Sequence, residues 1–104
     1  MNGCHFLGKL KGDPTLKESH NSFFVNFILE VEEYRRDKAG VKKRRTDLLK
    51  FQAWDSAAKT IEKHAQKNDI MVVEAIARNG LSKDPESVVF RVTNFKILPQ
   101  KGHN

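Results

Sequence analysis

The sequence predicts an all-β domain that contains one helix, and three observations support that prediction. Apolar side chains recur at every second position in several stretches, which is typical of strands with one buried face. In one stretch the apolar period changes to about 3.6 residues, which indicates an amphipathic helix. Clusters of Gly, Asp and Pro separate the stretches and mark turns. A chain of 104 residues is long enough for one compact core, so we expect one domain.

The first two expected strands precede the most basic part of the chain. Residues 1–10 alternate, and Gly8 falls where we expect a bulge or the close approach of another backbone. A turn at residues 12–14 ends this strand. Residues 23–33 give the strongest pattern, and one of its faces is expected in the core: Phe23, Val25, Phe27, Leu29 and Val31. The opposite face, which includes Phe24, is expected to be partly wet and partly aromatic.

Residues 35–45 are unusually basic. Seven of these eleven residues are Lys or Arg and one is Asp, so the segment carries +6, which equals the net charge of the whole chain. Gly40 falls in the middle of the segment, between two strand-like stretches. We therefore expect a hairpin arm that projects from the sheet and meets a polyanion, rather than a merely solvated loop.

The third expected strand, residues 46–54, holds the only tryptophan of the chain. Alternation places Phe51 and Ala53 on one face and Trp54 on the other, beside Lys50. A large ring next to a lysine on a wet face suits a binding surface. The alternative is that the ring packs under the helix or against another subunit, because tryptophans are usually largely buried.

A short helix of about three turns is expected next, within residues 55–69. We expect Asp55 or Ser56 to cap its N-terminus and Asn68 to adopt the left-handed conformation near its end. A narrow apolar stripe runs along it: Ala57, Ala58, Ile61 and Ala65.

Two strands complete the pattern, residues 70–78 and Val88–Leu98, with a turn at residues 83–86. Three strands, a helix and two strands is the plan of the OB-fold, a five-stranded Greek-key barrel with a helix between strands 3 and 4. An SH3-like barrel is the nearest alternative, but it usually lacks a full helix at that position. We assign residues 1–98 to an OB-fold nucleic-acid-binding domain and residues 99–104 to a short polar tail.

Several segments together carry a resemblance to a known family. They are N-x-C-x-F-L-G-K-L-x-x-D-P at residues 2–14, VNFILEV at 25–31, TDLLKFQAWDSAAKTIEKHAQKND at 46–69, IMVVEAIAR at 70–78 and FRVTNFKIL at 90–98. In order and spacing these segments resemble the bacterial-type single-stranded DNA-binding proteins.

This resemblance implies a binding mode. In that family aromatic side chains stack on bases while lysines and arginines follow the phosphates, and Trp54 stands where a stacking phenylalanine or tryptophan is usual. A stacked base contributes about 1–3 kcal/mol whatever its identity. We also expect stacking by Tyr34 and Phe24, with cover of the barrel rim as the alternative for Tyr34 and ordinary core packing for Phe24. Phosphate contacts are expected from nine cations: Lys9, Arg35, Arg36, Lys42, Lys43, Arg44, Arg45, Lys50 and Arg78.

The sequence also departs from the family pattern. Leu48 replaces a common stacking aromatic, no aromatic stands at residues 81–82, and Ala75 replaces a usual glycine. With fewer stacking platforms, affinity should depend more on the basic arm. The sequence ends in LPQKGHN, without the family's acidic tail that recruits replication and repair proteins. Either the tail was removed, or this is a short form of the kind that a phage or plasmid encodes.

The leading interpretation is a sequence-tolerant binder of single-stranded DNA that protects it in replication, recombination or repair. The alternative is a primosomal or RNA-binding OB-fold protein. We expect no enzyme, because no H-E-x-x-H, G-x-S-x-G, P-loop or paired-carboxylate pattern is present. The four histidines have no metal-ligand spacing, so neither a metal nor another cofactor is expected. A purely structural assembly protein would keep its function after charge reversal at Arg44 and Arg45.

Cellular context and self-association are expected as follows. Cys4 is the only cysteine, which suits a reducing compartment, and no signal peptide or bilayer-spanning run is visible, so we expect a cytoplasmic protein. The family resemblance implies homodimers that pair into tetramers. The first expected strand has apolar residues on both faces, Phe6 and Leu7, and could meet its copy across a two-fold axis.

Overall fold

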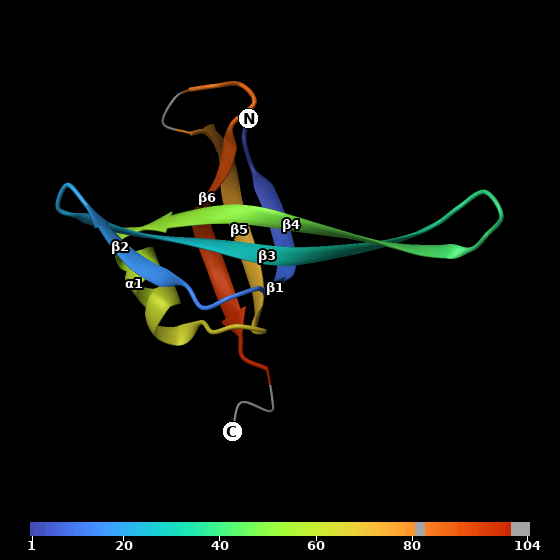
Figure 1. Cartoon of the computed structure of the whole chain (residues 1–104), viewed down its shortest axis with the longest axis horizontal. Coiled ribbons are helices and arrows are strands. Elements are labelled where there is room, and N and C mark those ends of the chain that lie inside the picture. Colours follow the sequence, from blue (N-terminus) through green and yellow to red (C-terminus); the bar gives the residue numbers. More distant parts are fainter. Residues whose placement is uncertain (81–82, 101–104) are drawn as a thin grey trace.

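The computed structural model describes residues 1–80 and 83–100, and within them it shows six strands and one helix (Figure 1). In chain order the elements are β1 (Cys4–Leu10), β2 (Thr15–Ser19), β3 (Ser22–Arg36), β4 (Lys42–Trp54), α1 (Asp55–His64), β5 (Ile70–Asn79) and β6 (Val88–Leu98). The predicted all-β class with one helix is confirmed. The short strand β2 was not predicted.

Five of these strands form a closed barrel. The sheet order is β1-β5-β6-β4-β3-β2, and β1 also pairs with β3, so the ring closes through β1, β5, β6, β4 and β3. Neighbours in the ring are antiparallel except β4 and β6, which are parallel. Because β2 lies outside this ring, α1 connects the third and fourth strands of the barrel itself. The predicted OB-fold is therefore confirmed.

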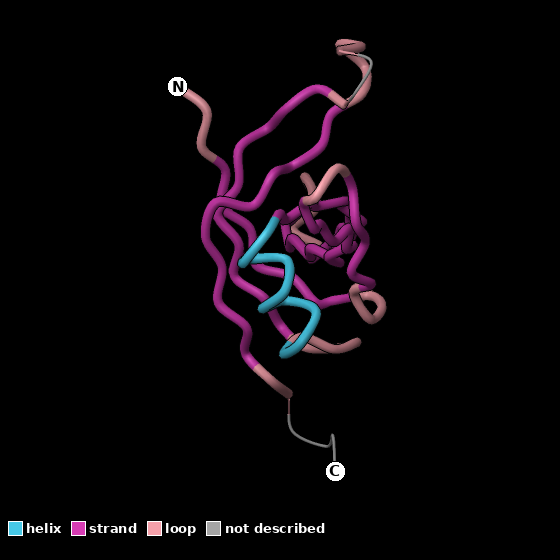
Figure 2. The backbone as a smooth tube through the Cα atoms, turned by 90° about the vertical axis from the view of Figure 1, so that its left-hand side faces the viewer, coloured by secondary structure: helices cyan, strands magenta, loops and turns pink. Residues whose placement is uncertain are grey.

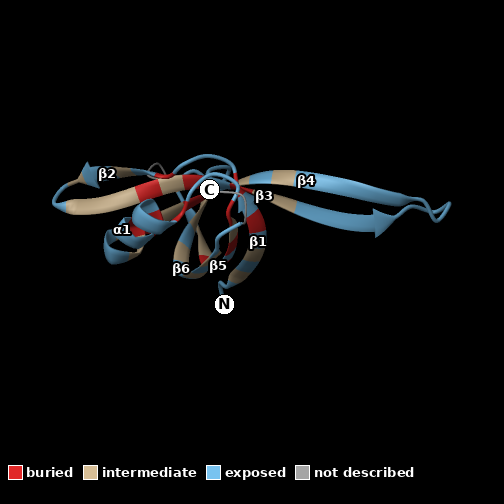
Figure 3. Cartoon of the chain, turned by 90° about the horizontal axis from the view of Figure 1, so that it is seen from below, coloured by how far each residue is buried: buried red, intermediate tan, exposed pale blue. Residues whose placement is uncertain are grey.

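Four phenylalanine rings form the centre of the core. The ring of Phe51 on β4 has its centroid 5.0 Å from that of Phe6 on β1, 5.5 Å from Phe27 on β3 and 5.6 Å from Phe90 on β6. Four strands of the barrel thus meet at one side chain. The remaining buried apolar residues surround these rings and are concentrated in the barrel and under the helix (Figure 3).

Gly8 lies where β1 and β3 close the barrel. It is buried, and a Cβ atom added there would stand 2.8 Å from the backbone oxygen of Glu30 and 3.1 Å from the Cβ of Leu29. Backbone cannot move aside as a flexible side chain can. The predicted close approach at Gly8 is confirmed, and it explains why no side chain fits at this position.

We expect Gly8→Ala to lower the free energy of unfolding by about 1–3 kcal/mol, because the added methyl overpacks the seam between β1 and β3. Urea unfolding followed by circular dichroism measures the change. Gly3→Ala is the matched control, since nothing lies within 4 Å of a Cβ atom added at Gly3. Equal stabilities of the two variants would contradict this account of the seam.

The β3–β4 hairpin continues beyond the barrel as a two-stranded arm, residues 32–46 (Figure 1). Its ladder runs from the barrel to the last pair, Arg36 with Lys42. Every residue of the arm is exposed, as Figure 3 shows. The predicted hairpin arm is confirmed, and it is longer than predicted, because the two strands extend through the charged residues.

The single acidic residue of the basic segment builds the tip of the arm. The Asp37 carboxylate accepts hydrogen bonds from the backbone N–H groups of Ala39 and Val41, each at 2.9 Å. Gly40 has a φ of +80°, a conformation that glycine adopts without strain. The Arg36 guanidinium donates to the Gly40 carbonyl oxygen at 2.9 Å. The turn is therefore held by local hydrogen bonds that require Asp37.

Helix α1 packs on β3, β4 and β2, at the end of the molecule opposite the arm (Figures 1 and 2). Its apolar stripe buries Ala58 and Ile61. The Lys59 ammonium of the helix lies 4.2 Å from the ring centroid of Phe23 on β3. Phe23 and Val31 were both predicted in the core, and both are only half-buried, because they lie toward the ends of the buried part of β3.

The predicted length of about three turns is confirmed, because the helix ends at His64. Two other details of the prediction are wrong. Asn68 takes its left-handed conformation, φ +78°, in the loop that follows rather than near the end of the helix. Trp54 occupies the N-cap position and no side chain caps the helix. The pairing of β4 with β3 continues through Trp54, so the chain must turn at Asp55, which has a φ of +54°. The Asp55 carboxylate does not cap the helix but accepts a hydrogen bond from the Phe23 N–H at 3.4 Å.

Candidate nucleic-acid interface

Two aromatic rings lie in contact on the outer face of the barrel. Phe24 on β3 and Trp54 on β4 are cross-strand partners, with ring centroids 4.9 Å apart and planes 30° apart. Their neighbours Val25 and Ala53 point the other way and are completely buried. Both rings are half-buried, so part of each remains accessible. The predicted placement of Trp54 and Phe24 on the outer face is confirmed.

Side-chain amides fix the orientation of the indole. The Trp54 Nε1–H donates to the Oε1 of Gln52 at 2.8 Å, and the Gln52 Nε2 donates to the Oδ1 of Asn26 at 3.4 Å. All three side chains belong to the outer face of β3 and β4. The polar edge of the indole is thus already satisfied, so a ligand meets the apolar ring. This arrangement suits stacking better than hydrogen-bonded recognition.

A groove of about 620 Å³ runs past these rings. We call it the Trp54 groove; its walls include Phe24, Trp54, Lys50 and Gln52 from the sheet and Val88 and Val89 from β6. A flat hollow lined by rings and amides, with a lysine at its side, has room for unpaired bases.

Arginine side chains add positive charge beside the Trp54 groove. The guanidinium of Arg91 on β6 lies 5.8 Å from the centroid of the Trp54 ring. Arg78 on β5 is exposed and pairs with Val89, which lines the groove. Arg78 was predicted as a site residue, and Arg91 was missed. Its place beside Trp54 depends on the parallel pairing of β4 with β6, in which Gln52 lies opposite Arg91.

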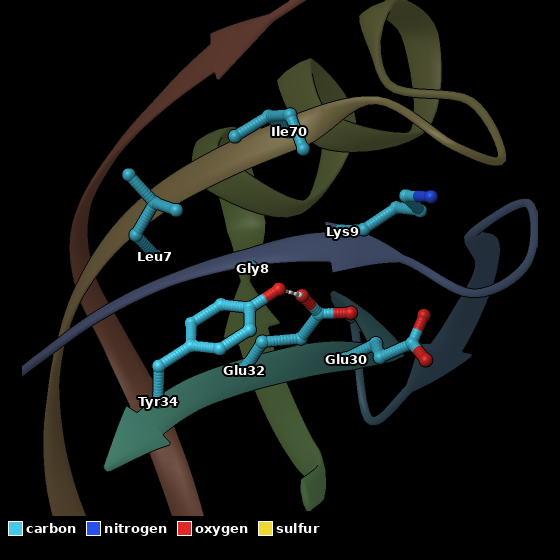
Figure 4. A pocket seen from close by; sticks show the side chains of 7 residues that line it. All are labelled: Leu7, Gly8, Lys9, Glu30, Glu32, Tyr34 and Ile70. Carbon is cyan, nitrogen blue, oxygen red and sulfur yellow. Dashed lines mark hydrogen bonds between the residues drawn. The ribbon is translucent and has the colours of Figure 1, made fainter. Parts of the chain in front are cut away.

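A second hollow, of about 320 Å³, lies between β1 and the base of the arm (Figure 4). Tyr34 lines it, with 57% of its surface exposed, and donates a hydrogen bond to a Glu32 carboxylate oxygen at 3.2 Å. The Lys42 ammonium lies 4.6 Å from the Tyr34 ring centroid. Lys9 lines the same hollow opposite Glu30. Tyr34 and Lys9 thus line one hollow, which is separate from the Trp54 groove.

Six of the seven cations of the arm lie on its strands, and these six divide equally between its two faces. Cross-strand pairs share a face, and the pairs Tyr34 with Arg44 and Arg36 with Lys42 alternate with the pair Arg35 with Lys43. We call the side with Arg36, Lys42 and Arg44 the Tyr34 face, and the side with Arg35, Lys43 and Arg45 the Arg35 face. Lys38 lies in the turn between the strands.

The arm and the Trp54 groove are far apart. Arg44, the partner of Tyr34, is ten residues from Trp54 along β4, which corresponds to about 33 Å of strand. A compact ligand cannot contact both places. The predicted site residues therefore fall into two groups, and only an extended, flexible ligand joins them on one molecule.

No group of three or more His, Cys, Asp or Glu side chains within residues 1–80 and 83–100 is placed to hold a metal ion. In the same part of the chain, no helix is long and apolar enough to cross a membrane.

Among the departures from the family pattern, Leu48 is 60% exposed on the outer face and Ala75 is buried in the core. Residues 81–82 lie outside the described residues.

The closed barrel with its aromatic groove and basic arm defines an OB-fold protein with a cationic outer surface. The model of the single-strand binding protein family matches residues 1–98. The chain belongs to this family. A comparison with curated proteins finds no match.

Solved structures agree on the fold. A deletion mutant of the single-stranded DNA binding protein from Thermus aquaticus superposes with a TM-score of 0.85 at 17% identity, over 98% of this chain and 52% of that chain. The Plasmodium falciparum SSB in complex with ssDNA superposes with a TM-score of 0.77 at 18% identity, over 95% of this chain and 96% of that chain. The SSB domain of a Synechococcus protein superposes with a TM-score of 0.68 at 18% identity, over 91% of this chain and 93% of that chain. The chain thus spans about half the length of the Thermus aquaticus protein.

Proposed function

We propose that this protein binds single-stranded DNA without marked sequence preference. The observation that carries the proposal is the Trp54 groove, in which a half-buried indole with a satisfied N–H stacks against Phe24 and lies 5.8 Å from the Arg91 guanidinium. The family match and the likeness to a structure solved with ssDNA support the same function.

Stacking and charge have separate parts in this proposal. Every base has a π-face, so stacking on Trp54 and Phe24 tolerates all sequences. Lys50, Arg78 and Arg91 neutralise phosphates near the groove, while the cations on one face of the arm extend the contact along the backbone. Lys9 and Tyr34 give a strand a further contact at the base of the arm.

We propose that such binding covers exposed template in replication, recombination or repair and involves no catalysis. Its place of action is the compartment that holds the DNA, which for a bacterial-type protein is the cytoplasm. Replication and repair proteins are the partners that this role implies.

Self-association is part of the proposal. On the outer faces of the paired strands β1 and β5, Leu7 and Val72 lie directly opposite each other, 60% and 37% exposed. Neighbouring exposed apolar side chains of this kind favour contact with a second copy. Light scattering with and without an oligo-dT of about 35 nucleotides distinguishes a dimer from a tetramer.

Fluorescence anisotropy of a labelled oligo-dT tests the main proposal. We expect saturable binding that an unlabelled duplex of the same length competes for poorly, and an affinity that falls by about 0.7 log units per phosphate contact for each log unit of salt. Competition by an RNA of the same sequence tests the RNA-binding alternative, because only the 2′-OH and the missing thymine methyl distinguish oligo-U from oligo-dT. Preference for the duplex or for RNA would contradict the proposed function.

A further inference from the structure

We propose that the arm holds two single strands at once, one on each face, and thereby promotes the pairing of complementary strands. The inference rests on the proposed binding of single-stranded DNA and adds a second activity to it. It comes from the geometry of the arm, which is a two-stranded ribbon with no third strand paired to it among the described residues.

Each face of the arm is a separate cationic surface. The Tyr34 face and the Arg35 face carry three cations each, and residues 32–46 are exposed on both sides (Figure 3). A protein that follows one strand needs its cations on one side only. The even division leaves half of the charge directed away from any single strand, and a second polyanion would neutralise that half.

The cations on both faces are available to phosphates. The Arg44 guanidinium lies 3.6 Å from a Glu32 carboxylate oxygen, and the Arg45 Nε lies 3.4 Å from an Asp47 carboxylate oxygen, but both pairs are exposed. Exposed ion pairs of this kind contribute only about 0–1 kcal/mol, so a phosphate can replace the carboxylate. Lys42 lies over the Tyr34 ring, which leaves its other side open to solvent.

The spacing suits an extended strand. Residues on one face of a β-strand repeat about every 6.8 Å, whereas the stacked strands of B-DNA advance by about 3.4 Å per nucleotide. An unstacked single strand can lengthen and turn its phosphates toward one flat face, whereas the phosphates of a duplex wind around its axis and leave that face. The arm is therefore expected to hold single strands rather than their paired product.

Contacts to phosphate leave the bases free. Lysine and arginine position a strand without reading or covering its bases, in contrast to the stacking surface in the Trp54 groove. Two strands held on opposite faces of one ribbon also gain a high effective concentration for each other, while the cations between them reduce their repulsion. Complementary bases next to the arm can then pair.

An annealing assay with two variants tests the proposal. The first replaces the cations of the Tyr34 face, Arg36→Gln, Lys42→Gln and Arg44→Gln; the second replaces those of the Arg35 face, Arg35→Gln, Lys43→Gln and Arg45→Gln. Both remove the same charge. A third variant removes the same charge outside the arm, Lys11→Gln, Lys63→Gln and Lys67→Gln. Energy transfer between complementary labelled oligonucleotides gives the annealing rate, and anisotropy gives the binding of one strand.

We expect the wild type and the third variant to accelerate annealing, and each face variant to lose that acceleration. Each face variant should still bind one strand on its remaining face, with a salt slope close to that of the wild type, because a single strand contacts the three cations of one face only. Loss of annealing in only one face variant, or in neither, would overturn the inference. A wild type that binds one strand but does not accelerate annealing would also overturn it while leaving the proposed function intact; a wild type that does not bind refutes both.

Discussion

Replacing the six cations on the two faces of the arm by glutamine should lower the salt dependence of DNA binding more than any other change of equal size. The variant combines both face variants, at Arg35, Arg36, Lys42, Lys43, Arg44 and Arg45. A strand that lies on one face of the arm loses three phosphate contacts at about 0.7 log units each, which predicts a slope that is smaller by about 2, with most of the affinity lost at low salt and little lost at high salt. Anisotropy titrations of oligo-dT at several salt concentrations measure both quantities.

The fold should survive this change, because the arm lies outside the core and Asp37 still closes its tip. Circular dichroism and urea unfolding check this point. An unchanged salt slope would mean that the arm does not contact the phosphates, and it would support the alternative of a structural assembly protein.

Trp54→Ala should weaken binding to single-stranded DNA by about 1–3 kcal/mol, which corresponds to about a 5- to 150-fold loss of affinity. The loss should persist at high salt, because stacking does not depend on counterion release. Trp54→Phe should retain most of the affinity, since a smaller ring still stacks. The same anisotropy titrations, performed at high salt, measure the effect.

Stability must be measured beside affinity in this case, because the indole packs on Phe24 and donates to Gln52. Gln52→Leu is a useful second variant: it frees the indole N–H but keeps the ring, so it should change affinity far less than Trp54→Ala. Equal affinities of the wild type and Trp54→Ala at high salt would exclude the ring as a stacking platform.

Alternation along the chain was sufficient to predict the face on which Phe24 and Trp54 lie. The pattern around Phe24 and Trp54 placed both rings on the side opposite to the buried Val25 and Ala53, and the structure has them there. Period-two patterns survive folding because a shift of one residue would expose the whole core face. The same reasoning predicted the close approach at Gly8.

The extents of the strands were harder to predict. β2 is only five residues long, and its strand conformation depends on pairing with β3. In the arm, charged residues occupy both faces, so no apolar alternation marks the strands beyond residue 33 or before residue 46. Pairing across the hairpin extends them, and this interaction is invisible in a local pattern.

The grouping of the cations depended on contacts between distant segments. Arg91 lies beside Trp54 through the parallel pairing of β4 with β6, and a single sequence gives no register for that pair. Lys9 lines the same hollow as Tyr34 because β1 closes the barrel against β3. Their roles in binding stay predictions, as do those of the other site residues.

The emission of Trp54 gives the most direct test of the stacking surface, because it is the only tryptophan in the chain. Oligo-dT is added to saturation at high salt, where the arm contributes least. Stacking of a base on the indole predicts strong quenching that saturates together with the anisotropy signal. Saturated binding with unchanged Trp54 emission would contradict the account, because the DNA would then lie elsewhere on the protein.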